Sequence, residues 1–383
     1  MRSNQQLRLL YVASVPIHLH TFFRNYARHF RAKGWVVDAA ASNVVKWEPS
    51  LHPDFDHLVN VDFIRNPFWE PLKLISRIHK VLQAIRVLAK NYDLIHVNTP
   101  MAAFLTRLAL RKTAARPKII YTAHGFHFFR GNSWWKNLLF RTLEKTASRW
   151  TDWLLVVNAE DYNAAVSFQT LPSSRITQIP EVGIDLAKFV KLPYNLKTEL
   201  GLATTDKVIT MVGELIPRKR QRDAIQALQS LPENYKLILV GNGKESDKLK
   251  EFVGQLHLTH RVFFLGFRHD VNAIVGNSDV LVLPSSQEGL PICVLEAMSL
   301  GTPTIVSDIR GSRDLVAAHC GYVFPVGNTQ ELATRIQTVL QADNSTIIKN
   351  ASAKIKGYAI EQVLKIHEDV YATLLKPVKS SQA

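Results

Sequence analysis

Apolar runs alternate with longer amphipathic segments along most of the chain. In the first half these runs occupy residues 7–14, 36–41, 94–98, 118–123, 153–158 and 176–179, and in the second half 208–213, 237–241, 262–266, 280–284 and 304–307. Short, almost unbroken apolar runs are typical of strands that are buried on both faces. Because segments of helical length separate them, the pattern predicts an α/β protein with two parallel sheets, each covered by helices on both faces.

The stretch 182–195 interrupts this alternation. It contains Gly183 and Pro193 and has little periodicity, so we predict a linker there between domains at 1–181 and 196–356. A chain of 383 residues, of which 46% are hydrophobic, is long enough for two domains with separate cores. The last segment, 357–383, is expected to begin with an amphipathic helix that ends near residue 375.

Open α/β sheets bind ligands beyond the carboxyl ends of their strands, so two such domains facing each other are expected to form a deep cleft between those edges. Four polar residues closely follow predicted strands and are candidates for this cleft: His124, Arg218, Lys219 and Glu288. The turn Gly241-Asn242-Gly243 also follows a strand, but it lacks the full Gly-x-Gly-x-x-Gly phosphate pattern and is equally typical of a tight turn.

Residues 288–296, with the sequence EGLPICVLE, are the most informative segment. Pro291 fits the first helical position, where the free amides of the next three residues and the positive pole of the helix dipole favour a phosphate. Glu296 would lie about 7 Å along the helix axis, which is roughly the reach from a diphosphate to a ribose diol. Isolated acidic residues are usually just solvated, but a buried strand before this segment and Gly301 after it favour a nucleotide-sugar site.

These features resemble the retaining glycosyltransferases of family 4, which have the GT-B architecture of two facing Rossmann-like domains. The resemblance covers nearly the whole chain. It rests on the two glutamates with seven residues between them, on Ala123-His124-Gly125-Phe126-His127-Phe128 and on Val212-Gly213-Glu214-Leu215. The last two segments look like the branch that builds bacterial exopolysaccharides, capsules and O-antigens.

In that family the first glutamate contacts hydroxyls of the donor sugar and the second holds the ribose, which implies these roles for Glu288 and Glu296. The resemblance also implies that Arg218 and Lys219 bind the diphosphate and that His124 meets the donor sugar near the reacting carbon. The loop before the helix and a segment whose backbone meets the nucleobase would complete the donor site: Gly289, Leu290, Pro291, Ile292, Gly266, Phe267 and Arg268.

The chain departs from the family pattern at two places. Glu214 stands where many relatives have an arginine, so Arg218 is the expected substitute for that guanidinium. His18 and His20 occupy the first strand-to-helix loop, where relatives often have a glycine pair; together with His127 they are candidates for the acceptor side. A lone histidine is more often structural and an isolated cation pair more often solvated, and these alternatives stay open here.

The formal net charge of +15 is concentrated in the N-terminal half. Residues 1–180 contain 24 Lys or Arg against 11 Asp or Glu, a net +13, which leaves +2 for the remainder. Such a field favours an anionic membrane surface or nucleic acid. Nucleic-acid binding is the alternative from another class. It would leave the paired glutamates unexplained, and no helix-turn-helix, zinc or RNA-binding signature accompanies the charge, so no nucleic acid is expected.

Two segments are candidates for membrane contact, although helices packed on a sheet and core aromatics produce the same patterns. Residues 71–90 predict a basic amphipathic helix. A second cluster mixes aromatic and cationic side chains: Phe126, Phe128, Phe129, Arg130, Trp134, Trp135, Lys136 and Arg141. No segment approaches the roughly 20 apolar residues of a membrane-spanning helix, and two cysteines provide no disulfide framework. We therefore expect a cytoplasmic protein, peripheral on the inner face of the cell membrane.

Asp54-Phe55-Asp56 superficially matches the D-x-D metal site of the other glycosyltransferase fold. It follows Pro53 in a predicted loop, with no diphosphate-binding elements beside it, so we interpret the match as coincidental. Neither a metal nor a cofactor is expected.

The sequence therefore predicts a retaining, metal-independent transferase acting in bacterial surface polysaccharide synthesis. It would move a hexose or N-acetylhexosamine from a nucleoside diphosphate sugar, UDP on family grounds, to a polyprenyl diphosphate-linked saccharide. The resemblance implies that the first domain receives the acceptor and that the final helix packs back onto it. A nucleotide-sugar epimerase of the same fold is the remaining alternative.

Overall fold

The fold is taken from a computed structural model that describes residues 6–64 and 71–376. Contacts divide the chain into two compact units: unit 1 lies within Met1–Val182 and Val363–Ala383, and unit 2 is Gly183–Gln362. Residues 377–383 of the expected C-terminal segment lie outside the described residues.

Unit 1 contains a parallel sheet with the strand order β3-β2-β1-β4-β5-β6-β7. The strands are Arg8–Val12 (β1), Val36–Ala41 (β2), Leu58–Asn60 (β3), Leu94–Asn98 (β4), Lys118–Ala123 (β5), Trp153–Val156 (β6) and Ile176–Gln178 (β7). The helices are Pro16–His18 (α1), Arg24–Ala32 (α2), Glu48–Leu51 (α3), Pro71–Leu88 (α4), Pro100–Leu110 (α5), Trp134–Ser148 (α6) and Ala159–Ser167 (α7), with a π-helical turn at Leu19–Phe23 (η1). The order reverses between β1 and β4, as in a doubly wound sheet.

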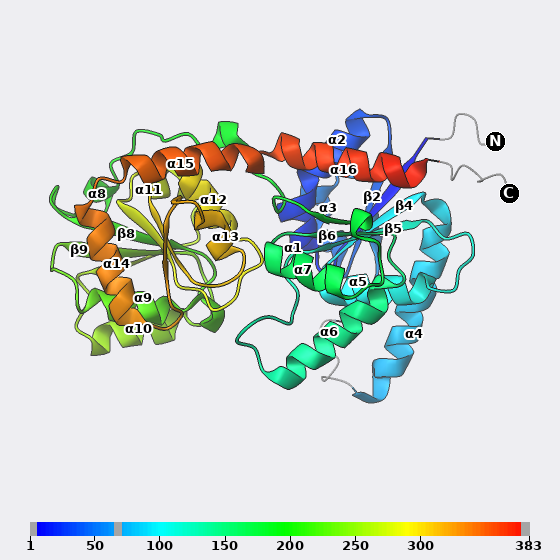
Figure 1. The fold of residues 1–383 in the computed structure, drawn as a ribbon, viewed down its shortest axis with the longest axis horizontal. Helices are drawn as coiled ribbons and strands as arrows, with labels where there is room; N and C mark the ends of the chain where they lie inside the picture. The colour runs from blue at the N-terminus through cyan, green and yellow to red at the C-terminus, as the bar shows by residue number, and fades with distance from the viewer. Residues whose placement is uncertain (1–5, 65–70, 377–383) are drawn as a thin grey trace. The chain divides into compact units, whose positions relative to one another are not determined.

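Helices cover both faces of this sheet (Figure 1). On one face α4, α5 and α7 pack against the strands through a core that includes Ile85, Leu105 and Phe168. On the other, α2 lies beside α16 (Ile360–Leu375), whose Tyr371 hydroxyl is 2.5 Å from Nδ1 of His96. The C-terminal part of α16 therefore belongs to the core of unit 1.

Unit 2 contains a second parallel sheet with the order β10-β9-β8-β11-β12-β13. Its strands are Lys207–Val212 (β8), Tyr235–Val240 (β9), Val262–Gly266 (β10), Val280–Leu283 (β11), Thr304–Ser307 (β12) and Tyr322–Phe324 (β13). Its helices are Leu196–Glu199 (α8), Gln221–Leu228 (α9), Ser246–Gln255 (α10), Val271–Gly276 (α11), Ile292–Ser299 (α12), Ser312–Val316 (α13), Thr329–Gln341 (α14) and Ser345–Ile355 (α15). The predicted α/β class with two parallel sheets is confirmed.

The stretch expected to be a linker, 182–195, includes Ile184, which pairs with residues 358–360 near the end of the chain. Ile184 donates its backbone N–H to Tyr358 at 2.9 Å and accepts from Ile360 at 2.9 Å. The division of the chain by contacts places residues from 183 onward in unit 2 and the second boundary within α16.

Candidate active site

The loop and helix that follow β11 carry both glutamates of the EGLPICVLE segment. The helix α12 begins at Ile292, and Pro291 is its N-cap in extended conformation. The prediction that Pro291 is the first helical residue was therefore wrong by one position, which is the usual uncertainty at helix ends. The amide of Val294 already bonds the Pro291 carbonyl at 3.1 Å, so only the amides of Ile292 and Cys293 remain from the three expected to face a phosphate.

Glu288 is buried, with 8% of its surface exposed, and it is paired with two cations. Its Oε1 accepts from Lys219 Nζ at 2.7 Å and its Oε2 from Arg218 Nη1 at 3.0 Å. Burial by itself raises the pKa of Glu288, but Lys219 and Arg218 outweigh it and hold the pKa below its usual range. The fold thus brings Glu288 together with Arg218 and Lys219, which lie 70 and 69 residues away in the sequence.

The backbone around Arg218 and Lys219 aims both side chains at this carboxylate. They belong to a 3₁₀ turn, Pro217–Lys219, that follows β8 and is closed by Arg220 in the left-handed conformation at φ 54°. The Arg218 guanidinium also donates to the carbonyl of Gln287 at 2.6 Å, which fixes the start of the glutamate loop. A lysine ammonium has three donors and a guanidinium five, so both cations retain N–H groups for a further anion.

Glu296 has the opposite environment. It lies in the middle of α12, and no hydrogen bond or ion pair to its carboxylate occurs among the described residues. Burial raises its pKa to about 7. The side chain is partly buried, and a partly buried carboxylate without a partner is unfavourable; two donor hydroxyls, as on a ribose, would satisfy it.

The glycines of the turn Gly241-Asn242-Gly243 are explained by backbone contacts within unit 2. A Cβ at Gly241 would lie 2.1 Å from the Gly213 carbonyl oxygen, and one at Gly243 would lie 2.3 Å from that of Leu215. Of the two interpretations left open by the sequence, this geometry supports the tight turn.

The segment expected to meet a nucleobase begins at the end of β10. Gly266 has φ 64° and accepts a backbone hydrogen bond from Gly241 at 2.8 Å. Phe267 is 67% exposed. Arg268 is engaged inside unit 2, donating to Asp270 at 2.6 Å and to Glu199 at 2.9 Å, so its guanidinium holds the loop in place.

His124 in unit 1 directly follows β5, at the carboxyl edge of the first sheet. Its Nδ1 donates to Oε1 of Glu181 at 2.5 Å, and its Nε2 lies 3.3 Å from Oδ1 of Asn98. The ring stacks on Phe22 with centroids 5.5 Å apart. The histidine is therefore held on three sides at the edge where ligands of such sheets bind.

Glu181 was not among the predicted site residues. It follows β7, is 4% exposed and has φ 54°, a conformation that favours glycine. Its Oε2 is buried without a hydrogen bond among the described residues. The rule that identified His124, a polar residue after a strand, could have found Glu181, but the predicted domain boundary fell beside it.

The three acceptor-side histidines belong to different segments of unit 1. His18 ends α1 and His20 lies in the π-helical turn, so the expectation that they occupy a loop was wrong. Arg24 lies 3.1 Å from Nε2 of His20, and burial, with the charge of Arg24, lowers the pKa of His20. His127 is exposed, and its ring centroid is 5.4 Å from that of Phe140.

Asp54 and Asp56 are structural in unit 1. The Asp54 carboxylate is buried and paired with Arg24 and Arg28, and Asp56 accepts from the Val37 backbone at 2.7 Å. These contacts support the interpretation of Asp54-Phe55-Asp56 as a coincidental match.

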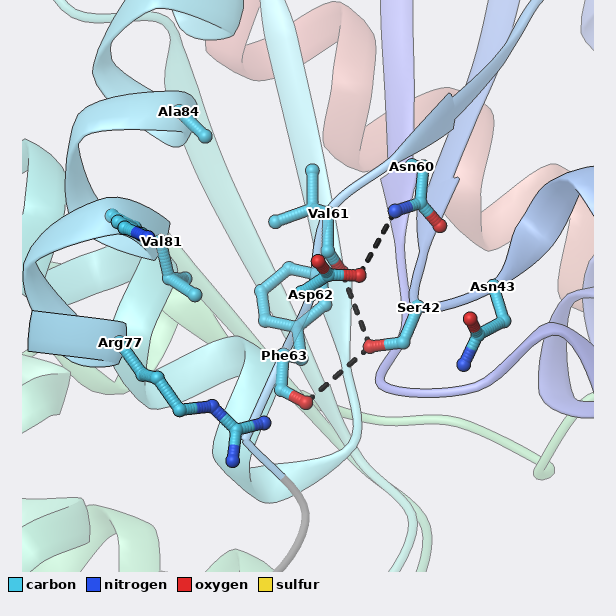
Figure 2. Close-up of a pocket in the computed structure, with 10 residues that line it drawn as sticks. Ser42, Asn43, Asn60, Val61, Asp62, Phe63, Arg77, Val81 and Ala84 are labelled. Atoms are coloured by element: carbon cyan, nitrogen blue, oxygen red, sulfur yellow. Dashed lines mark hydrogen bonds between the residues drawn. The ribbon is translucent and has the colours of Figure 1, made fainter. Parts of the chain in front are cut away.

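A pocket of about 860 Å³ opens beyond β2 and β3 (Figure 2). One wall consists of strand-end residues, where Ser42 donates to the carbonyls of Val61 and Phe63 at 3.1 and 3.4 Å. The other wall is a face of α4 that carries Arg77 and Lys80, one turn apart. The sequence had not indicated this pocket, because its residues come from segments without a recognisable motif.

Two doubly wound units with these residues at their strand ends define the class of GT-B glycosyltransferases. The structure of Anabaena HepE in complex with UDP and glucose has the same fold, with a TM-score of 0.78 at 23% identity over 96% of this chain and 100% of HepE. Residues 19–188 match the family model Glycosyltransferase Family 4, and residues 195–361 match Glycosyl transferases group 1.

Two relatives match over most of their length. The putative glycosyltransferase EpsD of Bacillus subtilis is 30% identical over 341 residues, covering 86% of both chains. UDP-Gal:alpha-D-GlcNAc-diphosphoundecaprenol alpha-1,3-galactosyltransferase of Escherichia coli is 33% identical over 317 residues, covering 79% of this chain and 81% of the relative. The chain belongs to the family 4 glycosyltransferases. Of the three classes considered from the sequence, which were a glycosyltransferase, a nucleic-acid-binding protein and a nucleotide-sugar epimerase, membership of this family supports the glycosyltransferase.

Proposed function

We propose that the protein transfers a hexose or N-acetylhexosamine, with retention of anomeric configuration, from a UDP-sugar to a lipid-linked saccharide. The product would serve the synthesis of a bacterial surface polysaccharide. The observation that carries the proposal is the pair of glutamates on one loop and helix. Glu288 is neutralised by two cations, whereas Glu296 is partly buried without a partner among the described residues and is suited to two hydroxyl donors.

The departing diphosphate needs positive charge in the transition state. Lys219 and Arg218 would supply it through the N–H groups not used by Glu288, and the first amides of α12 would add the positive pole of the helix. In this account no metal is needed. Glu288 orients the donor sugar and keeps both cations in place, and Glu296 accepts from the ribose.

His124 would contact the donor sugar near the reacting carbon from the edge of the first sheet. Its Nδ1 is committed to Glu181 and its Nε2 lies 3.3 Å from Oδ1 of Asn98, so a substrate would reach Nε2 beside the Asn98 side chain. The acceptor hydroxyl would attack on the face from which the diphosphate leaves, with a donor phosphate oxygen taking its proton. This geometry requires no covalent enzyme intermediate.

We assign the acceptor saccharide to the pocket in Figure 2. Asn60 and Asp62, joined by a 2.9 Å hydrogen bond, offer the amide and carboxylate groups that recognise sugar hydroxyls, and Arg77 and Lys80 suit the acceptor diphosphate. The acceptor and the α linkage named for the Escherichia coli relative support this choice of substrate class. A lipid-linked acceptor also supports action at the inner face of the cell membrane.

The test is a transfer assay with purified protein, UDP-sugars and a short-chain prenyl diphosphate saccharide. We expect UDP release that depends on the acceptor, an unchanged rate with EDTA, and a product whose anomeric proton signal shows the donor configuration. An inverted anomer or loss of activity with the chelator would contradict the mechanism. An isomerised donor formed without acceptor would indicate an epimerase.

A further inference from the structure

The exposed face of α6 is apolar, which is the reverse of an ordinary surface helix. Its most exposed apolar side chains are Trp134, Leu138 and Trp135, which are 77%, 62% and 53% exposed. Leu139 and Leu143 are also exposed, at 47% and 37%. At 3.6 residues per turn these five side chains lie within an arc of about 180°.

The opposite face of α6 carries the polar groups that anchor the helix to unit 1. The Asn137 side chain bonds the backbone N–H and carbonyl of Phe129 at 3.1 and 3.0 Å. The Glu144 carboxylate accepts from Arg107 and from the Tyr121 hydroxyl, both at 3.1 Å. Because these bonds fix the rotation of the helix, its apolar face points outward in the folded unit.

Cations surround this face, and one carboxylate borders it: Glu160 of α7 accepts from the Arg130 backbone at 3.4 Å and lines a hollow with Leu138 and Arg141. Lys136, Arg141 and Lys145 are exposed on the same helix, and Arg130 is exposed just before it. Residues 101–150 contain ten Lys or Arg and a single acidic residue, Glu144, which is turned inward and paired with Arg107. An apolar helix face with tryptophans and a cationic border is complementary to the headgroup region of an anionic bilayer.

We propose that α6 is a docking surface for an anionic lipid bilayer, with Trp134, Trp135 and Leu138 inserted at the headgroup boundary and the cations on lipid phosphates. The aromatic cluster singled out in the sequence is divided by the structure: Phe126 and Phe128 are buried in the core, whereas the two tryptophans are exposed. Figure 1 shows that α6 and α4, which lines the acceptor pocket, lie on the same side of unit 1, with α5 packed against both. Docking through α6 would bring that pocket close to a lipid-linked substrate.

The experiment is flotation of the full chain with vesicles of phosphatidylcholine, with and without 30–40% phosphatidylglycerol (on the order of cellular anionic content). We expect binding to the anionic vesicles only, weakened about tenfold or more by L138S/L139S. The substitution K136Q/R141Q/K145Q should remove the dependence on phosphatidylglycerol and on salt. The matched control is V190S/L192S, which changes two exposed aliphatic side chains of unit 2 and should leave vesicle binding unchanged.

Equal vesicle binding by wild type and L138S/L139S, with unchanged melting temperatures, would overturn the proposal. So would a wild-type dimer in sedimentation that L138S/L139S converts to monomer without loss of vesicle binding, because the face would then join two copies. A blue shift of tryptophan emission on vesicle addition, lost in W134S/W135S, gives a second readout. The proposal rests on the proposed membrane location, but vesicle binding needs no donor, so its failure is distinguishable from failure of the transferase mechanism.

Discussion

Glu288 and Glu296 lie on one short segment, yet their surroundings move their pKa values in opposite directions. Lys219 and Arg218 hold the pKa of Glu288 low against the effect of burial, whereas burial raises that of Glu296 to about 7. The first carboxylate is already satisfied by the protein. The second has no partner among the described residues and can accept hydrogen bonds from a ligand. Neighbouring carboxyl groups whose pKa values are shifted in opposite directions are typical of functional sites.

This difference predicts a pH-dependent cost of folding at Glu296. A carboxyl group whose folded pKa lies above its unfolded value destabilises the protein as pH rises through that range, here from about 4.5 to about 7. Without ligand, Glu296→Gln should therefore be more stable than wild type at pH 8, by up to about 3 kcal/mol. The measurement is thermal unfolding at several pH values; a difference that does not shrink towards pH 5 would contradict the raised pKa of this carboxyl group.

Glu288→Gln should show the opposite sign. Its folded pKa is lowered, so the ion pairs stabilise the protein above the unfolded pKa, and this contribution is lost as pH falls through the lower folded value. The variant should be less stable than wild type at pH 8, because Arg218 and Lys219 would keep their charges beside a neutral amide. Chemical denaturation at pH 8 tests this, and a stabilised variant would exclude the pairing.

Glu181→Gln tests whether this carboxylate positions His124. Loss of one charge-assisted hydrogen bond is expected to lower kcat roughly tenfold, leaving the donor dissociation constant unchanged. Glu181→Gly separates positioning from structure, because it relieves the left-handed backbone at φ 54° while removing the carboxylate. It should retain stability and still lose activity.

The exposed Glu361→Gln serves as the control for both variants. Full activity in Glu181→Gly would contradict a positioning role.

Sequence spacing could identify His124 and the cations Arg218 and Lys219 as candidates. It could not show that Arg218 and Lys219 contact Glu288, 70 and 69 residues away, because such pairs are created only by the packing of β8 beside β11.

At the scale of elements, the glutamate loop is fixed by a glycine from another strand-to-helix connection. Gly311, the N-cap of α13, has φ 71°, and a Cβ there would lie 1.8 Å from the Gly289 carbonyl oxygen. The loop cannot keep its conformation if this position carries a side chain.

Gly311→Ala is therefore expected to destabilise unit 2 by more than about 2 kcal/mol and to weaken nucleotide binding. Gly201→Ala is the matched control: its φ of 63° is similar, but no atom lies within 4 Å of the added Cβ. Only backbone strain, about 1–2 kcal/mol, should remain there. Unfolding and nucleotide titration of both variants check this, and equal effects would contradict the clash.

Most strands were predictable from their apolar runs. The strands Val36–Ala41, Leu94–Asn98, Lys118–Ala123, Val262–Gly266 and Thr304–Ser307 have the predicted bounds. The sequence missed β3 and β13, each three residues long, partly exposed and at the edge of a sheet, although it predicted the edge strands β7 and β10. Strands such as β3 and β13 form because the adjacent strand offers free backbone N–H and C=O groups, and their sequences contain no long apolar run that would predict them.

At the scale of the whole molecule, the described helices include none with the length and apolar content needed to cross a bilayer. Part of the positive charge noted in the sequence lies around the exposed face of α6, on Arg130, Lys136, Arg141 and Lys145. The outward rotation of that face was not predictable, because it depends on the bonds of Asn137 and Glu144 to other elements.

The measurement that tests the account most directly is nucleotide binding by wild type and Glu296→Ala, using thermal shifts with UDP, GDP and ADP. Each variant is compared with its own ligand-free state, because removal of the partly buried carboxyl alters baseline stability. We expect UDP to stabilise wild type by about 2.7 kcal/mol at a concentration of 100 Kd, and the variant to lose this shift. An equal shift in both proteins, or none with any nucleotide, would contradict the assignment of this site.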